Sequence, residues 1–283
     1  MTDGPSNDSS NGQRDETKNN ARWECTRRVA ADRWSELRAA AGFLTVLPGG
    51  PETPVGEAAP SDGFLHGAMA MFPLVGAGVG VVAGAVLILA HGLGLPPLVA
   101  AFIALAVLVV VTGALHEDGL GDVADGFGGG RTRDDKLRIM RDSRVGTYGV
   151  VAVVFSLGLR AAALAALPAV FGAAAVIAAA ALSRAMLPGI LRWLPPARPA
   201  GMGVEAGRPQ MQTVVVAATI GGLIALIALG LVAALLAAAL AVLGAAAVAL
   251  LARRQIGGHT GDVCGAAQQT AEVAALLAVV AWR

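Results

Sequence analysis

The chain has 283 residues, of which 55% are hydrophobic and 14% are charged, and its mean hydropathy is +0.66. Soluble globular proteins are about 25% charged, so this composition excludes a soluble fold and indicates a polytopic membrane protein. The net charge of +1 gives no reason to expect a nucleic-acid partner.

The first segment in chain order is polar. Its first 22 residues or so hold almost no apolar side chain, so we expect them to be disordered and to contain no signal peptide. The next residues, to Arg38, carry five arginines and suit the cytoplasmic membrane surface, with a solvated basic tail as the alternative. Residues 1–38 are therefore expected to form a cytoplasmic tail, and residues 39–283 a single membrane-embedded domain. Cys25 and Cys264 lie in unrelated contexts, so we expect reduced thiols.

Apolar runs of about 20 residues predict membrane spans. Candidate spans cover residues 67–90, 97–115, 148–167, 169–191, 213–252 and, more weakly, 270–282. The run 213–252 is too long for one span, so we divide it near Gly230. Residues 42–48 are too few to span and are expected to be interfacial or re-entrant. The predicted fold is an all-α polytopic bundle of six or seven transmembrane helices plus a short interfacial segment.

The basic residues predict which side of the membrane each connection faces. The linker 91–96 and the turn near Pro168 contain no Lys or Arg, whereas the stretch 117–147 contains six. Further basic residues occur at 192–212 and 253–254. With a cytoplasmic N-terminus and alternating spans, every basic connection falls on the cytoplasmic side. We therefore expect the functional residues on that face, with 116–147 as an active-site loop.

Three carboxylates in this stretch have helical spacing. Asp118, Asp122 and Asp125 stand at i, i+4 and i+7 and fall on one face of a helix. Like charges so arranged repel each other unless a cation or a substrate compensates. Mg²⁺ typically uses one or two carboxylates together with substrate phosphates, so the pattern predicts a metal–diphosphate site. The alternative is a solvated acidic helix end, and Gly119 and Gly121 either weaken the helix or admit a substrate.

The remainder of the stretch reads as a hinge followed by a short helix. Residues 127–132, FGGGRT, form a flexible or anion-binding turn. A short amphipathic helix capped by Thr132 should follow. Asp142, Ser143 and Arg144 then lead into the next span, where they either bind metal or phosphate or, for Arg144, anchor the span at the membrane surface.

Other polar residues lie within or beside the apolar spans. Arg160 and Arg184 are costly in a membrane and need either a functional role or a partner. Arg198 lies in a predicted cytoplasmic loop at 197–203. Residues 257–272 lie at the start of the last predicted span and contain further polar side chains, which are His259, Thr260, Asp262 and Glu272. His116 and His259 are candidate bases or polar contacts.

Several motifs in order resemble the cobalamin synthase family, the adenosylcobinamide-GDP ribazoletransferases. They are FPLVG at 72–76, HEDGLGDVADG at 116–126, IMRDSRVGTYG at 139–149, SR at 183–184 and GGHTGDVCGA at 257–266. The resemblance covers about residues 40–280. It departs from the family at Val46, where Arg is common, and at Gly121, where Ala is common, and His259 stands at a position that varies in the family.

The resemblance implies a Mg²⁺-dependent phosphotransferase in the bacterial cytoplasmic membrane. It would join adenosylcobinamide-GDP to α-ribazole or α-ribazole 5′-phosphate, and release GMP. The implied catalytic residues are His116, Asp118, Asp122 and Asp125, with the three aspartates as metal ligands. The implied substrate contacts are Arg131, Asp142, Ser143, Arg144, Arg184, Arg198, Thr260 and Asp262. Whether the protein forms a homo-oligomer or associates with other cobalamin-pathway enzymes stays open.

Two other classes of membrane protein share some of these features. CDP-alcohol phosphotransferases and membrane prenyltransferases also place spaced aspartates at the mouth of a span. CDP-alcohol phosphotransferases carry a second, later part of their aspartate motif, and this chain lacks it. Membrane prenyltransferases usually repeat their aspartate motif in the other half of the chain, and this chain has no such repeat. A transporter is the less favoured alternative, because the charges gather at one face and only Arg160 and Arg184 lie deep in apolar segments.

Overall fold

A computed structural model of the protein describes residues 33–47 and 67–283. The tail predicted at 1–38 lies mostly outside the described residues. A helix over 33–44 comes first. The elements that follow are η1 (Met69–Met71), α3 (Phe72–Gly92), α4 (Pro97–Thr112), α5 (Leu115–Gly129), α6 (Arg133–Ile139), α7 (Thr147–Ala165), α8 (Ala169–Ala185), α9 (Leu187–Trp193), α10 (Met202–Glu205), α11 (Met211–Leu229), α12 (Leu231–Ile256) and α13 (Gly261–Trp282). The described chain is helical, which confirms the predicted all-α class.

Six helices of the described chain are long and apolar enough to cross a membrane. They are Met69–Gly92, Thr147–Ala165, Ala169–Trp193, Met211–Leu229, Leu231–Ile256 and Gly261–Trp282. The predicted division near Gly230 is confirmed: this residue separates α11 from α12 with a φ of 76°, a conformation that suits glycine. The last span begins nine residues earlier than predicted, because polar side chains at its start are buried among other helices.

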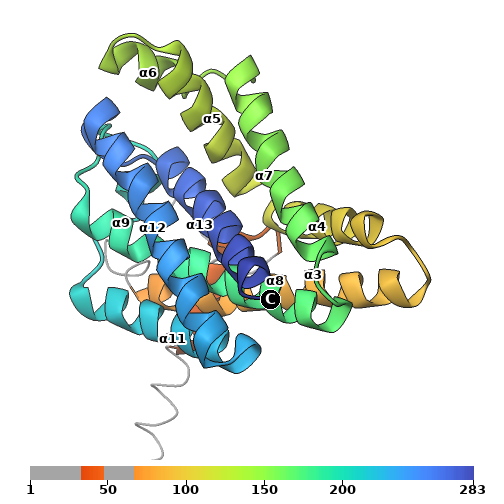
Figure 1. The fold of residues 1–283 in the computed structure, drawn as a ribbon. Helices are drawn as coiled ribbons and strands as arrows, with labels where there is room; N and C mark the ends of the chain where they lie inside the picture. The colour runs from red at the N-terminus through yellow and green to blue at the C-terminus, as the bar shows by residue number, and fades with distance from the viewer. Residues whose placement is uncertain (1–32, 48–66) are drawn as a thin grey trace, which may run out of the picture.

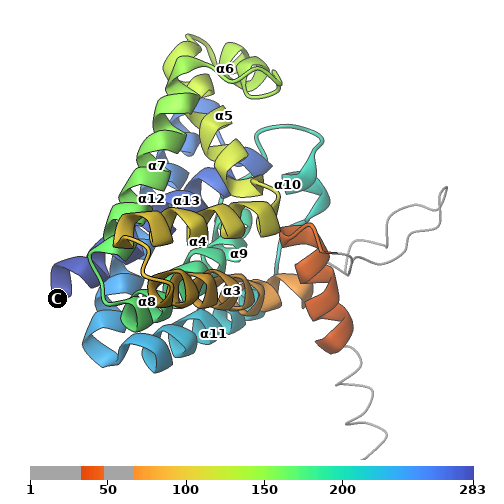
Figure 2. The same ribbon diagram turned by 90° about the vertical axis from the view of Figure 1, so that its right-hand side faces the viewer.

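The predicted span at 97–115 is shorter and leads into a sharp bend. α4 ends at Thr112, and α5 turns away from it by 91°. Gly113 and Ala114 make the turn with φ values of 62° and 56°. Figure 2 shows α5 rising from the end of α4. The stretch 116–147, expected as a cytoplasmic active-site loop with helical spacing of its aspartates and a short helix after Thr132, forms α5, which packs into the protein, and α6 beyond it.

The helices form two sets that cross at a large angle. In Figure 1, α3, α8 and α11 run across the view, whereas α5, α7, α12 and α13 are inclined toward α6 at the upper left. α3 packs closely on α8 because Gly76, Gly80 and Gly84 recur at every fourth position, and a Cβ on Gly80 would lie 2.7 Å from the Cα of Ile177. Such small-residue stripes let membrane helices approach closely without a hydrophobic driving force.

The charged connections gather at one end of the molecule. α6 and the segment 257–260 lie at the upper left of Figure 1, and the segment 194–210 runs along the left side toward the start of α11. The uncharged turns at 93–96, 166–168 and Gly230 lie toward the lower right. This distribution puts α5 and the start of α13 together at the charged end.

Candidate active site

The contact between α5 and α13 positions the acidic residues. A Cβ on Gly119 would lie 2.8 Å from the carbonyl oxygen of Asp262, and a Cβ on Gly265 would lie 3.2 Å from that of His116. Only glycines allow the two backbones to approach this closely. Gly119 therefore serves helix packing, rather than the approach of substrate that the sequence suggested, and it brings the α5 carboxylates beside the first turn of α13.

Three carboxylates form what we call the acidic cluster: Asp118 and Asp122 of α5 and Asp262 of α13. Asp118 is exposed, and the other two are partly buried. Asp118 and Asp262 both act electrostatically on Asp122, against the opposite charge of Arg198. Repulsion among close carboxylates in a partly desolvated site favours a bound cation.

The acidic cluster suits a metal ion shared with a ligand, rather than an ion enclosed by protein. Within residues 33–47 and 67–283, no three His, Cys, Asp or Glu side chains are grouped tightly enough to hold a metal ion by themselves. Carboxylate oxygens are the ligands that Mg²⁺ prefers, and substrate phosphates commonly complete its shell. The residues present therefore fit Mg²⁺ bound jointly with a diphosphate.

Asp125, the third aspartate of the predicted metal set, is turned toward α7. Its carboxylate is buried and accepts hydrogen bonds from the backbone N–H groups of Gly146 at 2.7 Å and Gly149 at 2.9 Å. These amides open α7, where a negative charge is stabilised by the helix dipole. Asp125 thus connects α5 to α7. The third carboxylate beside Asp118 and Asp122 is that of Asp262.

Replacing Asp125 with Asn should lower the free energy of unfolding by about 1–2 kcal/mol, because an amide carries no charge and has one acceptor oxygen for two donors. Chemical unfolding of purified protein in detergent measures this change. Asp134→Asn is the matched control, because that side chain is 93% exposed at the start of α6. Equal stability of the two variants would contradict the role given to Asp125.

Arg198 faces the acidic cluster from the segment before α10. Its Nη2 lies 3.3 Å from Oδ2 of Asp262, which also accepts a hydrogen bond from the Thr260 hydroxyl at 3.2 Å. A cavity of about 110 Å³ is lined by these three residues together with Ala200, Gly201, Gly203, Val204, His259 and Gly261. Nε of Arg198 and Nδ1 of His259 are buried, and neither has a hydrogen-bond partner in the described part of the chain. The structure thus brings predicted residues from two distant segments around one polar cavity.

Backbone hydrogen bonds hold the walls of this cavity. His259 N–H donates to the carbonyl of Pro195 at 2.8 Å, and Ala197 N–H donates to the carbonyl of His259 at 2.8 Å. Arg133 of α6 donates to the carbonyls of Ile256 and Ala197 at 2.9 and 2.7 Å. Arg133 was not singled out from the sequence, where it is one of six basic residues in its stretch. Burial lowers the pKa of His259, so its imidazole is neutral at neutral pH.

The predicted phosphate contacts around α6 are exposed. Thr132 caps α6 as expected, with its hydroxyl accepting from the N–H of Asp135 at 3.2 Å. Arg131, Ser143 and Arg144 lie at the surface. Arg144 donates to Asp142 at 2.7 Å, and its hydrogen bonds hold the pKa of Asp142 down at about 2. The neighbouring Arg141 acts electrostatically on Arg198, which makes it a cation near the cavity that sequence reasoning missed.

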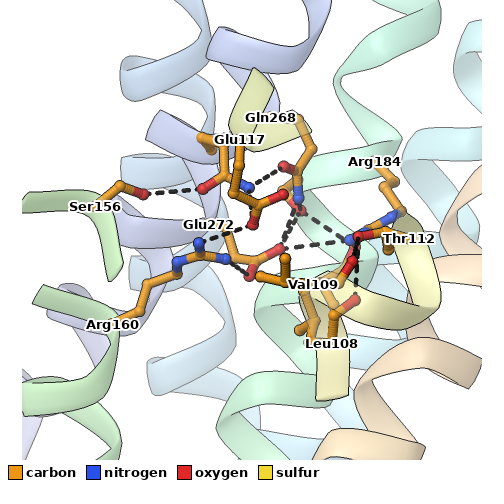
Figure 3. A network of polar contacts seen from close by, with 12 residues as sticks. Leu108, Val109, Thr112, Glu117, Ser156, Arg160, Arg184, Gln268 and Glu272 are labelled. Carbon is orange, nitrogen blue, oxygen red and sulfur yellow. Dashed lines mark hydrogen bonds and ion pairs between the residues drawn. The ribbon is translucent and has the colours of Figure 1, made fainter. Parts of the chain in front are cut away.

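Arg184 lies in a buried ionic network instead of at the cavity. Figure 3 shows the network, which we define as Glu117, Arg160, Arg184 and Glu272 with their amide and hydroxyl partners. Arg160 pairs with Glu117 at 2.9 Å and with Glu272 at 3.0 Å, and Arg184 lies 3.4 Å from Glu272. Both arginines are fully buried. This placement supports the pairing role that the sequence left open for them.

Amides and hydroxyls complete the buried ionic network. Gln268 donates to Glu272 at 2.6 Å and Gln269 to Glu117 at 3.0 Å. Ser156 of α7 donates to Gln269 at 2.9 Å. The network joins α5, α7, α8 and α13, and its α5 member, Glu117, directly precedes Asp118 of the acidic cluster. Glu117, which stands between His116 and Asp118, was not singled out from the sequence. The signal that could have found it is the pair of arginines in apolar spans, because such arginines require acidic partners.

His116 lies on the buried side of α5. Its side chain is 3% exposed, and Nε2 has no hydrogen-bond partner among the described residues. It lines a small, mostly apolar cavity with Phe43, Phe72 and Cys264. The expected role of His116 as a base stays a prediction. The stacked rings of Phe43 and Phe72, 5.8 Å apart, connect the predicted interfacial segment to this cavity.

Comparisons with known proteins agree with the motifs. A curated relative from Bradyrhizobium diazoefficiens, named adenosylcobinamide-GDP ribazoletransferase, is 45% identical over 92% of this chain and 97% of its own. Relatives of the same name from Azorhizobium caulinodans and Rhizobium meliloti are 47% and 43% identical, over 74% and 86% of this chain and 81% and 95% of theirs. No solved structure matches the chain. A family described as cobalamin-5-phosphate synthase matches residues 36–280, which include the acidic cluster, and the chain belongs to this family.

Proposed function

We propose that the chain transfers the adenosylcobinamide phosphate group of adenosylcobinamide-GDP to α-ribazole or α-ribazole 5′-phosphate, and releases GMP. The observation that carries this proposal is the acidic cluster of α5 and α13, whose member Asp262 lies 3.3 Å from Arg198 and lines the polar cavity together with it. The names of the relatives support adenosylcobinamide-GDP as a substrate, and the carboxylates of the acidic cluster support the proposal of a metal-bound diphosphate beside them.

The acidic cluster and Arg198 would each have a role in this reaction. Asp118, Asp122 and Asp262 would hold Mg²⁺, which neutralises charge on the diphosphate when it is bound. Arg198 would contact a phosphate oxygen through its guanidinium, in exchange for part of its contact with Asp262. Arg198, Thr260 and Asp262 in the lining of the cavity offer polar contacts to a diphosphate held beside the acidic cluster.

The bond changes follow from the chemistry of the substrates. A ribazole hydroxyl oxygen forms a bond to the corrinoid-side phosphorus, and the bond from that phosphorus to the GMP oxygen breaks. The hydroxyl proton must go to a base. A carboxylate of the acidic cluster is better placed to accept it than His116, whose imidazole lies on the buried side of α5. Catalysis then comes mainly from positioning and from electrostatic stabilisation.

The charge distribution supports a cytoplasmic active face in the bacterial inner membrane. The acidic cluster lies at the end of the molecule where the basic connections gather, and those connections favour the cytoplasmic side. A cytoplasmic active face would let the charged adenosylcobinamide-GDP reach the cavity from the cytoplasm without crossing the bilayer.

The test is reconstitution of the purified chain in liposomes with adenosylcobinamide-GDP, α-ribazole and Mg²⁺. We expect cobalamin and GMP in equal amounts, with no product when α-ribazole is omitted. Parallel reactions with α-ribazole 5′-phosphate show which acceptor is preferred. Release of GMP without formation of a corrinoid nucleotide product would indicate hydrolysis and would contradict the proposal.

A further inference from the structure

A groove outside the active site lies between α9 and α12. Its volume is about 350 Å³. Its walls are apolar and come from Ile190 and Trp193 on α9 and from Val242, Ala246 and Ala249 on α12. Arg253 is the single charged side chain among the described residues that line it. Figure 1 shows the two helices near each other at the charged end of the molecule.

The length of the groove matches one leaflet of a bilayer. Val242 and Arg253 are separated by eleven residues of one helix, or about 16 Å at 1.5 Å per residue. Half of the roughly 30 Å hydrocarbon core of a membrane is about 15 Å. An acyl chain that follows α12 through the groove would therefore reach from the middle of the bilayer to the level of Arg253.

The charged end of the groove suits a phosphate. Arg253 is exposed in the last turn of α12, and no acidic side chain in the described part of the chain pairs with it. A guanidinium binds phosphate oxygens through two parallel hydrogen bonds. The ring of Trp193 packs against Gly189 and remains 60% exposed, which suits the interface between headgroups and acyl chains.

We propose that this groove is a specific site for an anionic phospholipid, with an acyl chain between α9 and α12 and the phosphate on Arg253. The inference does not depend on the reaction catalysed. It has a structural consequence, because α9 leads into the Pro195–Ala197 segment and α12 leads into the segment of His259, and these two segments are joined by backbone hydrogen bonds. A lipid held between the helices stabilises the walls of the polar cavity.

The test is the thermal unfolding of purified, delipidated protein in detergent. Phosphatidylglycerol should raise the unfolding midpoint more than phosphatidylcholine with the same acyl chains. Arg253→Gln should remove most of this difference. The matched control is Arg254→Gln, which removes a neighbouring charge that is also exposed but does not line the groove. Equal effects of the two lipids, or equal losses in both variants, would overturn the proposal.

A second pair of variants tests the apolar part of the site. Ala246→Phe fills the groove and should abolish the phosphatidylglycerol effect, whereas Ala247→Phe lies on an exposed position of α12 outside it and should retain the effect. Glycerol phosphate should not replace the lipid. If it does, the site binds a phosphate without an acyl chain; if Ala246→Phe instead alters the oligomeric state, the groove is an interface between copies. Either result would overturn the proposal.

Discussion

Replacing Asp122 with Asn should reduce the rate of GMP release by at least roughly 10²-fold, as expected when a group that stabilises charge in the transition state is removed. Asp122 is the central member of the acidic cluster, within electrostatic reach of Asp118, Asp262 and Arg198. The substitution keeps the size of the side chain and removes its charge. Because it also relieves repulsion among the carboxylates, the variant should be at least as stable as the original protein.

The measurement is a time course of GMP release in liposomes that contain equal amounts of folded protein. Thermal unfolding of each preparation verifies that the variant is folded. Asp134→Asn, at the exposed start of α6, is the control and should keep its rate. A rate for Asp122→Asn close to that of the original protein would exclude the acidic cluster as the diphosphate site.

Replacing Glu272 with Gln should have the largest effect on stability. Glu272 is fully buried and is the carboxylate that pairs with both Arg160 and Arg184. Without it, Glu117 is the remaining carboxylate of the buried ionic network, and two buried guanidinium groups share its charge. Breaking a buried ion pair by removing one partner typically costs about 3–5 kcal/mol. We expect a loss of this size in the free energy of unfolding.

Steric trapping in micelles measures this free energy for a membrane protein. Glu205→Gln is a suitable control, because Glu205 is exposed on α10 and its loss should change stability by less than about 0.5 kcal/mol. If Glu272→Gln costs no more than this control, the buried ionic network does not hold the four helices together. A double substitution with Arg160→Gln should recover part of the loss, because it removes one of the unpaired charges.

The spans could be predicted from the sequence because length and apolarity nearly determine them. The bend between α4 and α5 could not, since it depends on Ala114 adopting a positive φ that alanine rarely adopts. By hydropathy, residues 97–115 form one apolar run. Hydropathy does not predict the direction that the chain takes after this run. The aspartates of α5 were expected on a helix face within a cytoplasmic loop, and the packing of this helix against α7 and α13 was not predicted.

Spacing on a helix explains which parts of the site were predictable. The i, i+4 spacing of Asp118 and Asp122 places them together. Asp125 is turned toward the N-terminus of α7, and this contact depends on how two helices pack. Asp262 was expected among the substrate contacts, but its position beside Asp122 rests on the Gly119–Gly265 contact between α5 and α13. Helical spacing predicts which residues of α5 share a face. The packing of α7 and α13 against α5 determines which other residues contact that face, and the spacing does not predict it.

The most direct test of the acidic cluster is the Mg²⁺ concentration that supports half-maximal GMP release. We predict that Asp262→Asn raises this concentration at least about tenfold, as expected when a metal ligand or its close partner is lost. Asp125→Asn should leave it nearly unchanged and should lower stability instead. The reverse result, with the Mg²⁺ requirement altered by Asp125→Asn and unaffected by Asp262→Asn, would contradict the site described for α5 and α13.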